Sequence, residues 1–169
     1  MDQVEAFNSL PTGPVMADLL ACCAAPDWGA AILAGRPYSS RGELLQAAEA
    51  AVRGLNWAQV LAGLSAHPRI GERAAGDSRE AAWSRREQAV AAQDPDDETT
   101  AALVRANRAY EQRFGYVFLI FASGRSSGEI LAAAVQRVHN DEATERVVVA
   151  GELGRIAALR LGKVLDALG

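Results

Sequence analysis

The stretch Tyr116-Val117-Phe118-Leu119-Ile120-Phe121 decides the fold class that the sequence predicts. Its β-branched and aromatic side chains suit a buried strand, but a continuous apolar run of this kind is equally typical of a buried helix, and periodicity alone does not separate the two. Around it, the good helix formers alanine, leucine, glutamate and arginine dominate the chain, and we find no second strand with which it would pair. We therefore predict a helix here and an all-α fold.

Helix start and stop signals on both sides of this stretch divide the rest of the chain. We expect further helices over residues 14–23, 28–33, 40–52, 56–64, 79–93, 97–114, 128–140 and 142–168, with a charged, glycine-rich loop over 71–78. The first helix is expected to bury a stripe made of Met16, Leu19, Leu20 and Cys23. The sequence thus predicts one compact domain over residues 1–169, with seven to nine helices.

Composition excludes several classes of function. The 21 acidic and 17 basic side chains give a net charge of -4, so no global positive field is present to hold nucleic acid. The longest strongly apolar run, 116–122, is far too short to span a membrane, and the N-terminus lacks the pattern of a signal peptide. The adjacent pair Cys22-Cys23 is expected to be reduced, because a bridge between neighbours is strained, and we place the protein in the cytoplasm.

Only two histidines are available for chemistry, and two histidines with two cysteines are too few for most metal clusters. His67 precedes Pro68, which disfavours helix at the residue before it, so the imidazole is expected at a helix end. A catalytic role there competes with that of a capping or surface histidine. His139, beside Asn140-Asp141, is interpreted as a side chain of a helix end.

A polar trio stands on the helix expected over 79–93. Ser84, Glu87 and Gln88 have spacings i, i+3 and i+4, which place them on one face, where they would either grip a polar planar ligand or form a solvated surface. Five arginines lie in the neighbouring stretch, and they would attract an anion or simply disperse over the surface: Arg69, Arg73, Arg79, Arg85 and Arg86. Arg160, within an apolar stretch, is either a snorkelling side chain or a clamp for an anion.

Common catalytic and nucleotide-binding motifs are absent from the sequence. It contains no GxSxG, GxxxxGK[ST] or GxGxxG pattern, and Gly124-Arg125-Ser126 resembles a phosphate loop only superficially.

Several segments together resemble the 2-oxo-4-hydroxy-4-carboxy-5-ureidoimidazoline (OHCU) decarboxylases of urate breakdown. The His67-Pro68-Arg69-Ile70-Gly71 box, followed about twenty residues later by the Glu87-Gln88 pair, is the most specific part of the resemblance. The other matching segments are Phe7-Asn8, Cys22-Cys23 with Trp28, Arg36-Pro37-Tyr38, Ser84, Asn107, Tyr110-Glu111, Phe114-Gly115-Tyr116, Gly124-Arg125-Ser126 and Arg160-Leu161.

The resemblance implies an all-helical, homodimeric enzyme that needs no metal or other cofactor and converts OHCU, a small molecule, to (S)-allantoin and carbon dioxide. It implies that His67 is catalytic with Glu87 as its partner in proton transfer, and that the central segment around Tyr116 is helical. Around the substrate it places Pro68, Ser84, Arg85, Arg86, Glu87, Gln88, Leu119, Ile120, Phe121, Ala122 and Ser123, with Arg160 as a candidate for the carboxylate. The departures from the family pattern are Arg85-Arg86 before Glu87, and Phe121 and Ser123 in a variable stretch.

Two other classes of function remain as alternatives. One is a non-catalytic helical interaction module, against which the intact His67, Glu87, Gln88 and Arg160 argue. The other is hydrolysis of a ureide, against which the missing nucleophile motif and metal cluster argue.

Overall fold

The computed structural model describes residues 1–72, 74–93 and 95–169, and within these ranges all regular secondary structure is α-helical. The predicted all-α class is therefore confirmed. Internal contacts divide the chain into two compact units, residues 1–66 with 150–169 and residues 67–149. The prediction of a single domain stays a prediction. None of the described helices is long and apolar enough to span a membrane.

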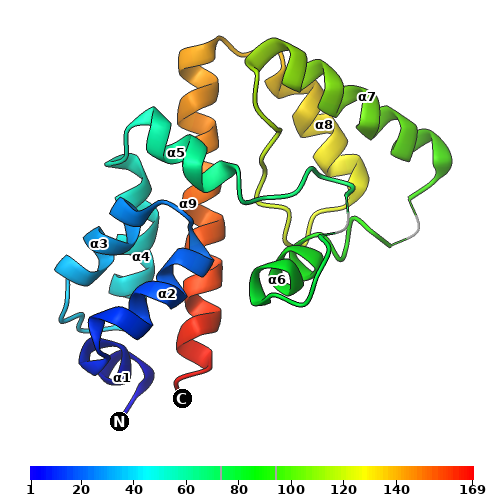
Figure 1. Cartoon of the computed structure of the whole chain (residues 1–169). Coiled ribbons are helices and arrows are strands. Elements are labelled where there is room, and N and C mark those ends of the chain that lie inside the picture. Colours follow the sequence, from blue (N-terminus) through cyan, green and yellow to red (C-terminus); the bar gives the residue numbers. More distant parts are fainter. Residues whose placement is uncertain (73, 94) are drawn as a thin grey trace. The chain divides into compact units, whose positions relative to one another are not determined.

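The first unit contains five helices and most of a sixth (Figure 1). They are α1 (Gln3–Ser9), α2 (Thr12–Cys22), α3 (Pro26–Ala34), α4 (Arg41–Arg53), α5 (Trp57–Leu64) and residues 150–166 of α9 (Glu142–Asp166). The fully buried Trp28 of α3 donates its indole N–H to the Ala48 carbonyl of α4 at 2.8 Å. Gly154 lets α9 approach α4 closely, because a Cβ there would lie 3.1 Å from the Glu49 carbonyl oxygen.

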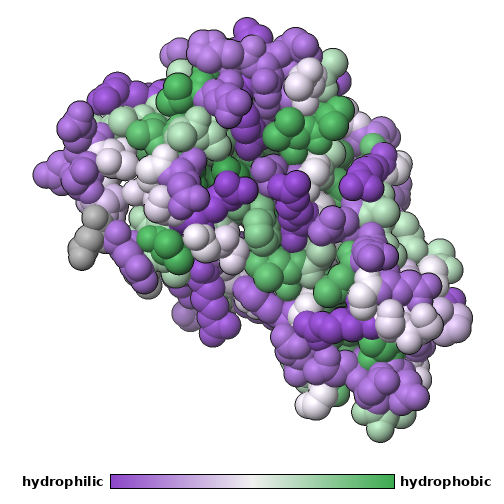
Figure 2. Space-filling model, turned by 180° about the vertical axis from the view of Figure 1, so that it is seen from behind, coloured by the Kyte–Doolittle hydropathy of each residue, from purple (hydrophilic) through white to green (hydrophobic). Residues whose placement is uncertain are grey.

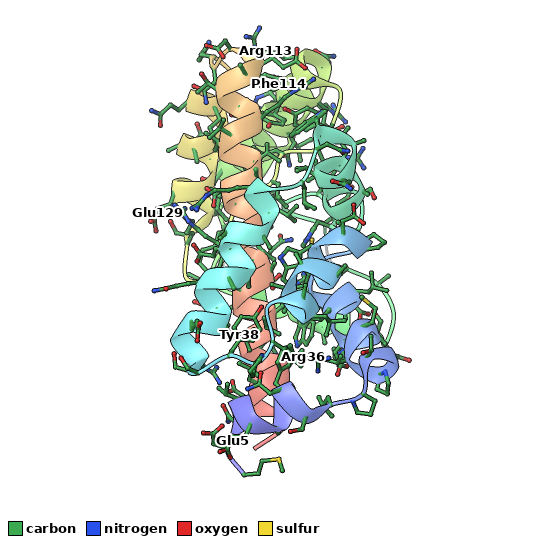
Figure 3. The ribbon with its side chains drawn as sticks, turned by 90° about the vertical axis from the view of Figure 1, so that its left-hand side faces the viewer. Glu5, Arg36, Tyr38, Arg113, Phe114 and Glu129 are labelled. Carbon is green, nitrogen blue, oxygen red and sulfur yellow. The ribbon has the colours of Figure 1, made fainter. Side chains whose placement is uncertain are left out.

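The Arg36-Pro37-Tyr38 motif has a structural role in this unit. Arg36 Nη1 donates to the carbonyls of Phe7, at 3.1 Å, and Leu10, at 2.8 Å. Asn8 and Tyr38 exchange two hydrogen bonds of 2.9 Å. Figure 3 shows Arg36 and Tyr38 beside α1, so this motif fastens the loop after α3 to the first helix.

The second unit contains α6 (Arg79–Glu87), α7 (Asp97–Phe114), α8 (Ser127–Arg137) and the first turns of α9. α7 and α8 pack against each other and run in the same direction, since Arg113 near the end of α7 donates to the Asn140 carbonyl just after α8, at 2.8 Å. The core of this unit consists of Ile70, Leu103, Tyr110, Phe118, Ile120, Ala122, Ile130 and Ala134.

The predicted helix over 116–121 is wrong, and the alternative, a strand, does not form either. Gly115 ends α7 with a positive φ of 81°, and the chain then returns as an extended trace to the start of α8 (Figure 1). Because α7 and α8 are parallel, the connection must run back along α8, which is about 16 Å long. The six residues 116–121 cover about 20 Å when extended, which is enough for this return. The extended form also leaves the Leu119 and Phe121 carbonyls free to accept hydrogen bonds from Arg137 and Arg125.

Two further helix predictions need correction. The helix expected over 79–93 ends at Glu87, and the chain continues in turns, with Ala89 N–H donating to the Arg86 carbonyl and Gln93 N–H to that of Val90. The expected stop at Asp94 lies outside the described residues. The first expected helix begins earlier, at Thr12, and buries Leu19 but leaves Leu20 38% exposed.

Most other helices begin close to the predicted residue, at a side chain that caps the first turn. Ser40 and Asn56 accept N–H hydrogen bonds at the starts of α4 and α5, as Asp96 does for α7. α8 was expected over 128–140, but it runs from Ser127 to Arg137. Its cap is Ser126, whose N–H donates to the Glu129 carboxylate at 3.2 Å. α1, which the sequence analysis missed, has the same kind of capping box with Asp2 and Glu5.

The surface mixes polar and apolar groups. Hydrophilic side chains cover much of the face shown in Figure 2, with smaller hydrophobic patches between them. This is ordinary for a chain with 50% hydrophobic residues, because apolar atoms make up a large share of any protein surface.

Candidate functional site

The loop that carries His67 is fastened to α7 by two side chains one helical turn apart. Glu111 holds Arg69 through two contacts, Nε to Oε1 at 2.6 Å and Nη2 to Oε2 at 3.2 Å. Asn107, which is buried, donates Nδ2 to the Ile70 carbonyl at 2.9 Å. Asn107 and Glu111 belong to the segments that resemble the family, but their role in holding the loop was not predicted; their i, i+4 spacing was the available signal.

The same loop is tied to the end of α6. Gln88 Oε1 accepts the N–H of Gly71 at 3.1 Å, where the backbone has a φ of 91°. His67 itself is half-buried and lies after the end of α5, as Pro68 predicts. The box from 67 to 71 is therefore a loop held at its C-terminal half by α6 and α7.

The polar trio does not form a solvated face. Ser84 and Glu87 are 6% and 8% exposed, and Gln88 is half-buried. Of the two neighbouring arginines, Arg86 is exposed, whereas Arg85 turns back along the preceding loop and donates Nη1 to the carbonyls of Ala74, at 2.9 Å, and Gly76, at 3.2 Å. Burial of this hydroxyl and carboxylate contradicts the solvated interpretation, and the ligand-binding interpretation stays a prediction.

A cavity of about 890 Å³ opens in this unit. Its wall includes Arg69 to Glu72 of the loop, Ser84, Arg85 and Gln88 of the α6 end, and a row of α7 side chains, namely Thr100, Leu103, Val104, Asn107, Arg108 and Glu111. The volume lies in the range of small-molecule sites. Three predicted residues, Ser84, Arg85 and Gln88, thus meet on one wall, while His67, Pro68 and Glu87 are not part of this wall.

The predicted substrate segment 119–123 is held by hydrogen bonds from Arg125. Leu119, Ile120 and Ala122 are buried, and Phe121 and Ser123 are half-buried. Arg125 Nε donates to the Phe121 carbonyl at 2.9 Å, and the Arg125 N–H donates to the Ala122 carbonyl at 3.0 Å. Gly124-Arg125-Ser126 is thus a turn that shapes this segment and caps α8.

Arg160 lies on α9 in the first unit and is only 3% exposed, so the interpretation as a snorkelling surface side chain is wrong. Its Nη1 is 3.5 Å from the Ala21 carbonyl oxygen. The Cys23 thiol nearby has a raised pKa because of its burial, an effect that a backbone hydrogen bond with Ala25 and the positive charge of Arg160 partly offset. Both cysteines are buried, and neither forms a disulfide within the described residues.

A buried charged cluster in the second unit was not predicted from the sequence. Arg137 of α8 and Glu145 of α9 form an ion pair at 2.5 Å, and Tyr110 of α7 joins it. A signal was present in the sequence, because Arg137 continues the buried stripe of Ile130 and Ala134 at helical spacing.

We expect Asn107→Ala to lower the free energy of unfolding by about 1–3 kcal/mol, because it leaves the Ile70 carbonyl without its donor. Urea unfolding followed by far-UV circular dichroism measures the loss. Arg105→Ala, at an exposed position on the same helix, is the control and should change stability by less than about 0.5 kcal/mol. Equal effects of the two substitutions would show that Asn107 does not fasten the loop.

A sequence model described as "OHCU decarboxylase" matches residues 8–162. The OHCU decarboxylase of Haloferax volcanii is 35% identical over 130 residues, which cover 76% of this chain and 74% of that protein. The OHCU decarboxylase of Amia calva is 30% identical, with coverages of 83% and 81%. The Arabidopsis thaliana "Uric acid degradation bifunctional protein TTL" is 29% identical over 86% of this chain, which spans only 45% of that protein's length.

Solved structures agree with these sequence relatives. A crystal structure of OHCU decarboxylase in the presence of (S)-allantoin has a TM-score of 0.71 at 26% identity, over 87% of this chain and 96% of that one. A crystal structure of (S)-allantoin synthase has a TM-score of 0.70 at 21% identity and supports the fold; the match covers 95% of this chain and 53% of that one. The motifs, the helical fold and the match over residues 8–162 confirm the prediction made from the sequence: the chain belongs to the OHCU decarboxylase family.

Proposed function

We propose that this chain decarboxylates OHCU to (S)-allantoin and carbon dioxide. The observation that carries the proposal is the family match over residues 8–162, together with two relatives of at least 30% identity that are named OHCU decarboxylases. The cavity, whose wall includes Ser84 and Gln88, supports it, because it offers polar groups and the room that a ureide needs.

The substrate explains why so few catalytic groups suffice. The carbon that loses carbon dioxide also carries a hydroxyl and adjoins a ring C=N bond. When its bond to the carboxylate breaks, the electron pair moves toward that imine, so the substrate supplies its own electron sink. The imine nitrogen takes up one proton and the ring carbon that bears the ureido group takes up another. The hydroxyl loses its proton and becomes the ring carbonyl of allantoin, so one proton is consumed overall. The protein has to orient the substrate and manage these protons.

We assign the proton transfer to His67 and Glu87. His67 engages the hydroxyl or the departing carboxylate, and the pair delivers a proton to one face of the ureido carbon, which makes the product a single enantiomer. Gln88 and backbone groups near Ile120 hold the ureido and ring amides, and Arg160 is assigned to the carboxylate. The remaining substrate contacts are assigned to Pro68, Ser84, Arg85, Arg86, Leu119, Phe121, Ala122 and Ser123.

The direct test uses freshly generated OHCU, with formation of (S)-allantoin followed by circular dichroism. The chain should produce a single enantiomer far faster than the spontaneous reaction does. A chain that binds (S)-allantoin without turnover would point to the non-catalytic alternative, and no effect on either molecule would contradict the proposal altogether.

We also propose that no metal or organic cofactor takes part. Within the described residues, no cluster of histidine, cysteine and carboxylate side chains suited to a metal occurs, and the electron sink of the substrate makes a cofactor unnecessary. Dialysis against EDTA should therefore leave kcat unchanged within error. A loss of activity that added Zn²⁺ or Mg²⁺ restores would contradict this part of the proposal.

We also propose that the chain forms a homodimer and acts in the cytoplasm. Family resemblance supports a homodimer, which light scattering of the purified protein would test. The two free, buried cysteines are what a reducing compartment favours, so we place the enzyme in the cytoplasm.

A further inference from the structure

Arg137 and Glu145 form a buried ion pair in the second unit, with side chains that are 8% and 0% exposed. Glu145 Oε1 accepts from both Nε, at 2.8 Å, and Nη2, at 2.5 Å, of Arg137. The same oxygen accepts the Tyr110 hydroxyl proton at 2.6 Å, and Oε2 accepts Asn140 Nδ2 at 3.0 Å. Burial, followed by this hydrogen bond and the negative charge of Glu145, raises the pKa of Tyr110, so the phenol stays a donor.

The remaining Arg137 donor explains what the pair holds in place. Nη1 donates to the Leu119 carbonyl oxygen at 2.7 Å, and the guanidinium lies 4.6 Å from the centre of the Phe118 ring. One side chain of α8 therefore grips the extended segment before that helix. Only the fork of an arginine serves Glu145 and Leu119 together, because a lysine ammonium is a single point of attachment.

A second anchor fixes which way the segment faces. Arg125 Nε holds the Phe121 carbonyl, two residues after Leu119. In an extended chain, the peptide groups of residues i and i+2 point to the same side and those of i+1 to the other. With Leu119 and Phe121 bound to guanidinium groups, the N–H and C=O of Ile120 face the opposite side.

We propose that Arg137, held by Glu145, is a positioning residue that presents the Ile120 peptide groups to the ureide. The inference rests on the proposed decarboxylase function. It assigns Arg137 no contact with substrate: it acts through the main chain of residues 119–121. If only the hydrogen bond from Arg137 to the Leu119 carbonyl is lost, the ion pair with Glu145 remains. We therefore expect the segment to shift while the core stays packed.

The test is Arg137→Lys, which keeps the charge opposite Glu145 but gives up the fork to Leu119. We expect kcat on OHCU to fall by about 10-fold or more and KM to rise, since small misplacements of a bound substrate are costly. The melting temperature should fall by only a few degrees. Arg146→Lys is the matched control, because Arg146 makes an exposed ion pair with Glu142 at 2.7 Å on the same helix as Glu145, and it should keep wild-type kcat and KM.

A readout independent of turnover separates this proposal from the proposed function. The backbone amide resonances of residues 119–123 should shift in Arg137→Lys and stay in place in Arg146→Lys. Wild-type kinetics in Arg137→Lys, or unshifted amide resonances, would overturn the positioning role. A wild-type protein without turnover would instead contradict the decarboxylase function, and the amide resonances would still report whether Arg137 sets the conformation of the segment.

Discussion

Replacing His67 by asparagine should lower kcat on OHCU by about two to four orders of magnitude, the usual contribution of a positioned acid or base. Asparagine keeps a polar amide of similar reach but cannot exchange a proton near neutral pH. His67 precedes a loop that Asn107, Glu111 and Gln88 fasten in place, so the fold should survive the substitution. Formation of (S)-allantoin, followed by circular dichroism, gives the rate, and urea unfolding gives the stability.

The second histidine supplies the matched control for this substitution. His139 is exposed near the end of α8, and His139→Asn should leave kcat unchanged. If His67 and Glu87 act as one unit, the double variant His67→Asn/Glu87→Gln should be hardly slower than His67→Asn alone. Wild-type turnover by His67→Asn would remove His67 from the mechanism. If the fold-losses of kcat in His67→Asn and Glu87→Gln multiply in the double variant, the two residues act in separate steps.

Glu145→Leu should be the most destabilising of the substitutions discussed, at about 3–5 kcal/mol, because it leaves the buried guanidinium of Arg137 without its counter-charge. It also removes the acceptor of the buried Tyr110 hydroxyl. For a chain of this length, the loss corresponds to a fall in melting temperature of about 10 °C or more. Calorimetry or thermal circular dichroism would measure it.

An exposed pair on the same helix serves as the reference for Glu145. Glu142 contacts Arg146 at the surface, and Glu142→Leu should cost less than about 1 kcal/mol. The double variant Arg137→Met/Glu145→Leu should recover much of the stability lost in Glu145→Leu, because it removes the orphaned charge. The double variant should not recover activity, since it lacks the hydrogen bond from Arg137 to the Leu119 carbonyl. A stable Glu145→Leu would mean that the guanidinium finds another partner.

Local signals predicted most of the helices because they act within a few residues. Ser40 and Asn56 cap the helices that follow them, and Gly54 ends α4. The apolar run from 116 to 121 could not be assigned in this way, since its conformation depends on the parallel course of α7 and α8 and on Arg137, which is distant in the sequence. Sequence spacing does not report a tertiary constraint of that kind.

The candidate site shows the same division between local and tertiary information. The spacing of Ser84, Glu87 and Gln88 placed them on one face, and Pro68 placed His67 beyond a helix end. Their burial, and the cavity wall that α7 contributes, depend on packing between elements and were not predicted. In the sequence, nothing distinguishes Asn107 and Glu111 from other polar residues of a helix. Only the structure shows that Asn107 binds the Ile70 carbonyl and Glu111 binds Arg69.

The extended return between α7 and α8 has a consequence for the evolution of the site. The peptide groups of this segment are chemically the same whichever side chains it carries, so drift at half-buried Phe121 and Ser123 would leave the proposed main-chain contacts with the ureide intact. Selection would act instead on the side chains that hold the segment in place, Arg137, Arg125 and Glu145, to which the proposal assigns no contact with the ligand. A deep mutational scan for activity should therefore find tolerance at Phe121 and Ser123 and intolerance at Arg137, Arg125 and Glu145.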